Sequence, residues 1–264
     1  MCGRINVSDN EGVQALMRML GVPLFPTFEP SWNLSPTAIL NAVVAQSVSG
    51  SPSLDTTPLR WGIKAPWAEP GKSVRPLINA RSETLFTKPT FKTLAQAHRA
   101  IVPVTGFYEW ERQEEKRVPY YVQVNELPAM LLATVFQPLT TDEIKQEQKQ
   151  KTKTKISSPQ MGFSFDDPEP EPDAESTHNE TPTFTGDFAV VTTQATGELA
   201  TIHHRTPVML NTEQAQRWLY TEDLAELEAM MLPEAVMNVR LTEVSEAVNS
   251  SRNDGPECVK AVRR

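Results

Sequence analysis

Seven short apolar segments rich in β-branched residues constrain this chain most. Runs of this length, bounded by Pro-rich or polar turns, predict buried strands. They occupy residues 38–46, 59–64, 99–111, 119–124, 130–136, 187–194 and 239–244. Helical patterns are fewer, at 13–20 after a cap at Ser8 or Asp9, at 83–98 with a break at Pro89, and at 212–220 with a Thr cap. We therefore expect an α+β fold with a curved, mainly antiparallel sheet or barrel-like core and peripheral helices.

The segment 141–182 has a different character from the rest of the chain. It holds ten acidic residues and five Lys, in a Lys/Gln run followed by a Pro/acidic run with almost no apolar residue. Such a segment cannot bury enough surface to offset the entropy lost on ordering. We expect a disordered charged insertion within one domain that spans 1–264.

The whole-chain composition argues against a disulfide framework, a membrane span and a secretory leader. The 264 residues include two Cys, no apolar run long enough for a membrane span, and no basic-then-apolar leader at the start. We expect a cytoplasmic protein, a monomer, without membrane contact. The net charge of −8 does not exclude nucleic acid, because the segment 141–182 contributes −5 of it and −3 remains for the rest.

The chain begins Met1-Cys2-Gly3-Arg4, which places a cysteine directly behind the initiator. Removal of Met1 would leave the α-amine and the thiol of Cys2 on one residue. With pKa values near ~8 and ~8.5, both are partly nucleophilic at neutral pH, and together they can close a thiazolidine on an aldehyde. We expect the positive charge of Arg4 to lower the pKa of the thiol. The alternative is that Cys2 is an inert, buried residue.

Three further polar clusters interrupt apolar surroundings. Asn79 opens the run NARSET, which is either a functional loop or the capped start of a helix. Glu109 lies between aromatic residues in GFYEW, where burial would raise its pKa and suit it to acid–base chemistry, unless strand alternation turns it toward solvent. His203 lies in IHHRTP, but no further His or Cys follows at ligand spacing, so we expect no metal site and no cofactor.

In chain order, the motifs MCGR, WNLSPT, RWGIKAPW, RPLINARSETL, VPVTGFYEW, PYYV, VVTTQA, IHHRTPVML and VNSSRNDGPECV resemble the SOS-response-associated peptidase (SRAP) family. The resemblance runs from Cys2 to about Cys258 and implies a single α+β domain that brings an abasic site in single-stranded DNA to the processed N-terminus. It implies catalytic roles for Cys2, Asn79, Glu109 and His203, and DNA contacts for Arg4 and Arg81. One departure is Thr206, which stands where the family usually has Met.

The function that the resemblance implies is capture of the abasic sugar as a thiazolidine crosslink, reversible with help from Glu109 and accompanied by weak lyase activity. We expect Trp61, Trp67 or Trp110 to stack on neighbouring bases, with at least one of these rings buried instead. One alternative is a cysteine peptidase in which His203 activates Cys2 and which removes Met1 from itself. Another is a protein that binds single-stranded or modified DNA without chemistry, for which Cys2 would be dispensable.

Overall fold

The computed structural model describes residues 2–22, 25–48, 51–67, 74–114, 116–125, 127–145, 184–235 and 237–262. Its larger sheet has five main strands, which are β3 (Ile39–Val48), β4 (Ser51–Trp61), β6 (Arg99–Val104), β9 (Met130–Pro138) and β10 (Gly186–Gln194). These strands close into a ring, because β10 pairs with β4 on one side and with β9 on the other. Short strands extend it, namely β5 (Asn79–Arg81), β11 (Arg205–Pro207) and β12 (Met209–Leu210).

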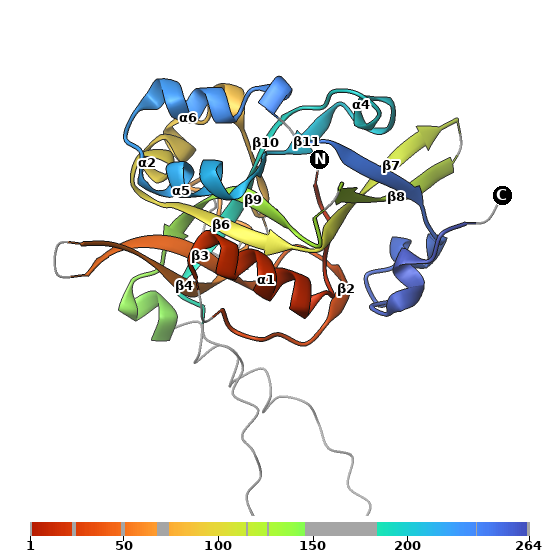
Figure 1. The fold of residues 1–264 in the computed structure, drawn as a ribbon, viewed down its shortest axis with the longest axis horizontal. Coiled ribbons are helices and arrows are strands. Elements are labelled where there is room, and N and C mark those ends of the chain that lie inside the picture. The colour runs from red at the N-terminus through yellow and green to blue at the C-terminus, as the bar shows by residue number, and fades with distance from the viewer. Residues whose placement is uncertain are drawn as a thin grey trace, which may run out of the picture.

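A second sheet of five strands packs beside the ring, in the order β13-β8-β7-β1-β2. Its members are β1 (Ile5–Val7), β2 (Ser31–Leu34), β7 (Gly106–Gln113), β8 (Lys116–Val124) and β13 (Val239–Glu243). The β7–β8 hairpin extends away from the ring at the right of Figure 1. Of the pairings between described strands, only β10–β4 and β10–β5 are parallel. The predicted α+β fold with a barrel-like, mainly antiparallel core is confirmed.

Helices lie around the ring rather than within the sheets (Figure 1). The longer ones are α1 (Asn10–Leu20), α2 (Pro89–Ala97), α5 (Thr212–Tyr220) and α6 (Leu224–Met230), and α4 (Leu199–Ile202) is a single turn. The described residues also form four 3₁₀ turns, namely η1 (Ser82–Thr84), η2 (Pro233–Ala235), η3 (Glu246–Asn249) and η4 (Pro256–Val259). In the described ranges, no helix is both long and apolar enough to cross a membrane.

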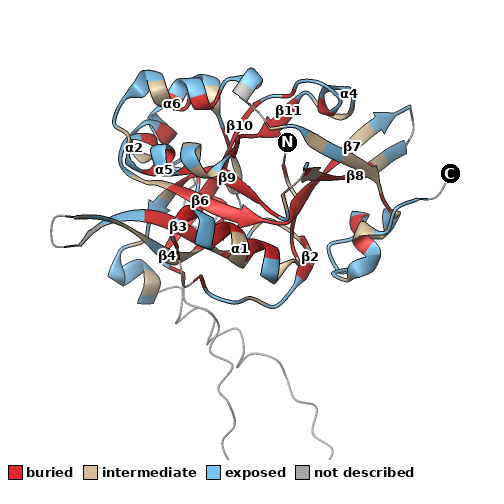
Figure 2. Ribbon diagram, in the orientation of Figure 1, coloured by how far each residue is buried: buried red, intermediate tan, exposed pale blue. Residues whose placement is uncertain are grey.

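The ring strands are buried on both faces over much of their length, most continuously in β6 and β10, which are largely red in Figure 2. Successive side chains of a strand point to opposite faces. One set of alternate residues, such as Val43, Ile101 and Ala189, packs under α1, α2, α5 and α6. The other set, such as Val44, Val102 and Val190, packs against β1, β7 and β8. We call this second cluster the inter-sheet core, and it contains Cys2.

The segment 99–111, predicted as one strand, is two strands in different sheets. The chain leaves the ring after Val104 and enters the second sheet at Gly106. A Cβ atom at Gly106 would lie 2.5 Å from Cε2 of Tyr121, so only glycine allows this close approach of β7 to the Tyr121 ring. The predicted strand 59–64 likewise ends at Trp61, because Gly62 turns the chain with a φ of 122°.

Helix starts show how far local signals determine the ends of elements. Asp9 accepts from the Gly12 amide and caps α1, as predicted. Pro89 does not interrupt a helix but occupies its first turn, where its missing N–H is not needed. The cap of α5 is Asn211, in a capping box with Gln214, rather than the predicted Thr. Asn79 caps nothing, because it belongs to strand β5, which pairs with β10.

The predicted charged insertion over 141–182 lies, from residue 146 onward, outside the described residues. Its first residues, 141–145, form a helical turn in which Thr140 and Glu143 exchange hydrogen bonds. The two sides of the segment are close together, because the Leu139 amide donates to the Thr185 carbonyl at 2.9 Å. The insertion therefore joins two neighbouring antiparallel strands, β9 and β10.

Candidate active site at the N-terminus

Cys2 lies fully buried in the inter-sheet core. The residues after it run beside β7, where the Tyr108 amide donates to the Arg4 carbonyl at 3.0 Å. Burial, followed by the negative charge of Glu109, raises the pKa of the Cys2 thiol above its ordinary value. The expected lowering by the charge of Arg4 is therefore wrong, since Arg4 lowers this pKa only through a backbone hydrogen bond, whose effect is smaller than that of burial. The Arg4 guanidinium instead donates to Asn33 Oδ1 and to the Val248 carbonyl, at 2.7 and 3.1 Å.

Asn79 reaches the N-terminal segment from the ring. Parallel pairing with β10 holds β5 in place, and from there Nδ2 of Asn79 donates to the Cys2 carbonyl at 2.9 Å. Its Oδ1 is buried and accepts no hydrogen bond from the part of the chain that the structure describes. A buried acceptor beside Cys2 suits a donor supplied by a substrate hydroxyl or by a freed α-amine.

Glu109 points into the protein rather than toward solvent. It shares a face of β7 with Phe107, which belongs to the inter-sheet core, and it is only 3% exposed. Burial raises the pKa of the Glu109 carboxyl group, as the sequence predicted. A carboxyl group with a raised pKa can hold a proton and return it near neutral pH, which is what acid–base catalysis needs.

His203 follows α4 directly and faces Glu109. Its Nδ1 lies 3.9 Å from Oε1 of Glu109 and 3.0 Å from the Arg205 amide, which donates to it. The same Nδ1 lies 3.1 Å from the Arg205 carbonyl, so it can accept from the amide or donate to the carbonyl according to the tautomer of the ring. Burial lowers the pKa of His203, which favours the neutral form of the ring. A neutral imidazole beside a protonatable carboxyl group can relay a proton.

An ion pair that the sequence did not single out ties two of these segments together. Both terminal nitrogens of Arg205, in β11, donate to the carboxylate of Glu83, in η1. Arg205 also donates to the Thr192 carbonyl and is almost fully buried. Glu83 lies four residues after Asn79, and Arg205 two residues after His203. Glu83 lies in the motif RPLINARSETL and Arg205 in the motif IHHRTPVML, but only the folded chain brings the two residues together.

The predicted DNA-contacting residues are placed differently from one another. Arg81 is exposed, and so is Trp67, at 58%. Trp61 is fully buried, stacks on Phe188 with centroids 6.3 Å apart, and donates through Nε1 to the Ile78 carbonyl. Its predicted role as a stacking surface for bases is therefore wrong, because neither face of its ring is accessible. Trp110 is partly exposed and its Nε1 donates to Asn249 at 2.7 Å.

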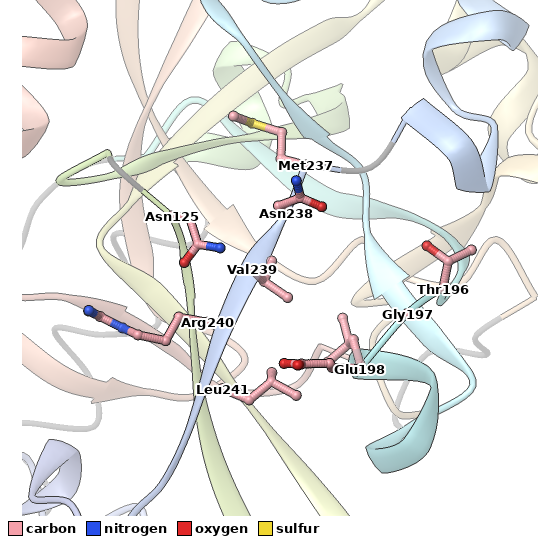
Figure 3. A pocket seen from close by; sticks show the side chains of 10 residues that line it. Asn125, Thr196, Gly197, Glu198, Met237, Asn238, Val239, Arg240 and Leu241 are labelled. Carbon is pink, nitrogen blue, oxygen red and sulfur yellow. The ribbon is translucent and has the colours of Figure 1, made fainter.

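A pocket of about 510 Å³ opens between β13 and the loop that precedes α4 (Figure 3). Its lining includes Asn125, Thr196, Glu198 and Leu241, and Arg240 points away from Glu198 in this view. None of the four predicted catalytic residues lines it, so its size alone does not make it the active site. Within the described ranges, no group of three or more His, Cys, Asp or Glu side chains could hold a metal ion.

Comparison with known proteins identifies a family that matches nearly the whole chain. A model of the SOS response associated peptidase (SRAP) family matches residues 1–251. The chain is 25% identical over 237 residues to the abasic site processing protein YoaM of Bacillus subtilis, covering 89% of this chain and 86% of that protein. It is 28% identical over 244 residues to the abasic site processing protein HMCES of Xenopus tropicalis, covering 89% and 67%.

Solved structures share the fold. A protein from Bacteroides thetaiotaomicron superposes with a TM-score of 0.65 at 17% identity, covering 99% of this chain and all (100%) of that one. A phage-related protein from Bordetella bronchiseptica superposes with a TM-score of 0.56 at 22% identity, covering 91% and 94%. The two-sheet architecture is therefore common to proteins with very different sequences.

Proposed function

Because the chain belongs to the SOS response associated peptidase (SRAP) family, we propose that it processes abasic sites in single-stranded DNA by covalent capture on Cys2. Relatives that match nearly nine-tenths of the chain carry the name abasic site processing protein. The observation that carries the proposal is the convergence on one chain end of Asn79, Glu109 and His203, which come from three distant segments.

The first bond is formed by the amine. Removal of Met1 would turn the Cys2 nitrogen into an α-amine, which adds to the open-chain aldehyde of the sugar and gives a carbinolamine. Protonated Glu109 then donates its proton to the carbinolamine hydroxyl, which leaves as water, and an iminium ion forms. The raised pKa of Glu109 favours the protonated carboxyl group that this step needs. His203 relays a proton at the sugar hydroxyl while the ring opens.

The thiol closes the adduct. As the bond from Sγ to the sugar carbon forms, the electrons of the C=N bond return to nitrogen, and the thiol proton passes to the Glu109 carboxylate. The product is a thiazolidine, and the net reaction releases one water. A thiol with a raised pKa stays protonated until a base receives its proton, so the proximity of Glu109 to Cys2 suits this second step.

The raised thiol pKa argues against the cysteine peptidase alternative. A peptidase nucleophile is activated by an imidazole that lowers the thiol pKa, whereas burial and Glu109 raise that of Cys2. The two functions also need different groups. A peptidase needs only the thiol, but the thiazolidine needs the thiol and the amine together.

The test is incubation of protein that has lost Met1 with single-stranded DNA carrying one abasic site. We expect a denaturation-resistant band whose mass is that of protein plus DNA less one water. Blocking the α-amine or replacing Cys2→Ser should abolish the thiazolidine. Cys2→Ala retains an amine, so it should form a Schiff base and nick the strand slowly by β-elimination.

Cys258→Ser is the matched control, since Cys258 is equally buried but lies in a separate cluster with Tyr108, Tyr121 and Val248. This variant should crosslink like the wild type. A stable crosslink that survives acetylation of the α-amine would contradict the proposal and favour a thiol-only reaction.

A further inference from the structure

The pocket of about 510 Å³ beside β13 has an apolar floor that the candidate active site does not use. We call it the β13 pocket, and it is lined by Asn125, residues 196–199 and residues 237–241. Val239 and Leu241 lie opposite valines of β8 on the inner face of the second sheet, and both pack against the inter-sheet core. Leu199, in the facing wall, is buried in the same core. The floor is therefore held in place by the packing beneath it.

One edge of β13 is unpaired along this pocket. Among the described strands, β13 is the last of its sheet and pairs only with β8. The Asn125 amide donates to the Asn238 carbonyl, so Asn238 and every second residue after it bond to β8. The N–H and C=O groups of Val239 and Leu241 therefore point away from β8. Within the part of the chain that the structure describes, these groups have no hydrogen-bond partner.

The same edge already accepts an extended segment just beyond the pocket. Ala261 forms an antiparallel bridge with Val244, and the Val262 amide donates to the Glu243 carbonyl at 3.0 Å. This bond agrees with the outward direction of alternate residues in β13. It also shows that a second backbone fits against this edge. An unpaired strand edge is a template for another extended chain.

Two charges of opposite sign flank the unpaired edge. Glu198 is exposed, and in Figure 3 its carboxylate points toward Leu241, on the inner face. Arg240 lies on the outer face, where its Nη2 donates to Gln123 Oε1 at 2.8 Å. An added strand presents alternate side chains to these two faces. The charges therefore match a strand with a basic residue opposite Leu241 and an acidic residue opposite Arg240.

We propose that the β13 pocket is a docking site for an extended peptide segment of a partner protein, which adds to β13 as an antiparallel strand. From its N-terminal end, the segment presents a Lys or Arg beside Glu198, an Asp or Glu beside Arg240, and an aliphatic side chain against Val239. The first and third residues exchange backbone hydrogen bonds with Leu241 and Val239, and the N–H of the second points away from β13. The inference does not depend on the capture chemistry of Cys2.

The first test uses a fluorescein-labelled peptide, Thr-Thr-Lys-Glu-Val-Thr-Thr, and measures its binding to the full chain by fluorescence anisotropy. N-Methylation of the Lys amide removes the hydrogen bond to the Leu241 carbonyl and should weaken binding roughly tenfold. N-Methylation of the Glu amide is the matched control, because that N–H points away from β13, and it should change the affinity by less than about twofold. Equal weakening by the two methyl groups would overturn the proposal, as would a lack of binding at about 1 mM peptide.

The second test measures the charge contact. Glu198→Gln should bind the Lys peptide roughly threefold more weakly, and should bind a peptide with Gln in place of Lys as the wild type does. Glu228→Gln is the matched control, since Glu228 is an exposed acidic residue of α6 outside the pocket. It should leave the affinity for the Lys peptide unchanged. Equal losses for the two variants would reflect net charge alone and would overturn the contact with Glu198.

Three other occupants of the edge would each overturn the proposal. A second copy of this chain would give a dimer in analytical ultracentrifugation that the peptide dissociates. Single-stranded DNA would displace the peptide and would bind Glu198→Gln more tightly than wild type. Residues 263–264, which lie outside the described residues, would give peptide binding only after their removal.

Discussion

Glu109 is buried in an environment that destabilises its ionised form. Its side chain lies in the inter-sheet core, and burial raises its pKa above that of a free carboxyl group. In the folded state the proton therefore binds more tightly than in the unfolded chain, and ionisation reduces stability. This destabilisation is absent below the unfolded pKa of about 4.3 and complete above the raised folded pKa.

For Glu109→Gln we predict opposite effects on activity and stability. Crosslinking should slow by roughly 100-fold or more, because the proton donor and acceptor is lost. Thermal stability should rise at pH 8, because no charge is buried, and the gain should vanish below about pH 4. Melting curves across this pH range and crosslinking time courses measure the two effects.

Glu111→Gln is the control for this prediction. Glu111 lies two residues further along β7 on the same face, but closer to solvent, where it accepts from Gln113 and Tyr120. The Glu111→Gln variant should keep the crosslinking rate and the thermal stability of the wild type. A Glu109→Gln protein that crosslinks at the wild-type rate would remove Glu109 from the mechanism.

At the scale of elements, the passage from β6 to β7 depends on one glycine. For Gly106→Ala we predict a loss of about 1–3 kcal/mol of unfolding free energy, because the added methyl group would overlap the Tyr121 ring. Urea denaturation measures it. Combining the change with Tyr121→Leu should recover part of the loss, whereas an unchanged denaturation midpoint would show that the ring moves freely aside.

The ion pair between Glu83 and Arg205 links η1, next to the strand of Asn79, with β11, next to His203. Hydrogen bonding from Arg205 lowers the pKa of Glu83. The stabilisation is therefore fully present above the unfolded pKa of about 4.3 and is lost as pH falls through the lower folded pKa.

For Glu83→Gln we predict a loss of about 1 kcal/mol at pH 7, a modest value because the Glu83 side chain is 51% exposed and partly screened by solvent. The difference from wild type should shrink at pH 3, as measured by urea denaturation at both pH values. Glu213→Gln, which removes the more exposed partner of Arg217 in α5, is the control and should lose less. Equal losses for the two variants would contradict the anchoring role of Glu83.

At the scale of the whole molecule, the charged segment lies between two ring strands that pair with each other directly. The antiparallel pairing of β9 with β10 brings Pro138 opposite Gly186, so the chain on either side of the insertion is already joined. Closing such a loop with fewer residues does not increase its entropic cost.

We predict that replacing residues 146–183 by a short Gly/Ser linker changes the melting temperature by no more than about 2 °C and leaves crosslinking intact. Thermal denaturation and the crosslinking assay test this on the full chain and the shortened one. A fall of 10 °C or more would mean that the segment packs on the domain.

Much of the architecture was predictable because it depends on local pattern. β-Branched apolar runs at 130–136 and 187–194 became β9 and β10, and Asp9 capped α1. The sequence also shows where the glycines are, but it does not show which of them the packing requires. Gly106, at the start of β7, must be glycine because Tyr121, fifteen residues later, occupies the space that a Cβ atom would need.

The amino-acid sequence alone determined which segments form strands and which residues are candidates for chemistry, because both follow from residue type and short-range spacing. Only the tertiary structure decided that Trp61 is core rather than surface, that Glu109 faces inward, and that Glu83 meets Arg205. Strand alternation assigns a side chain to one of two faces but does not say which face another sheet covers. That choice, and the pKa values that follow from it, arise from contacts between residues far apart in the chain.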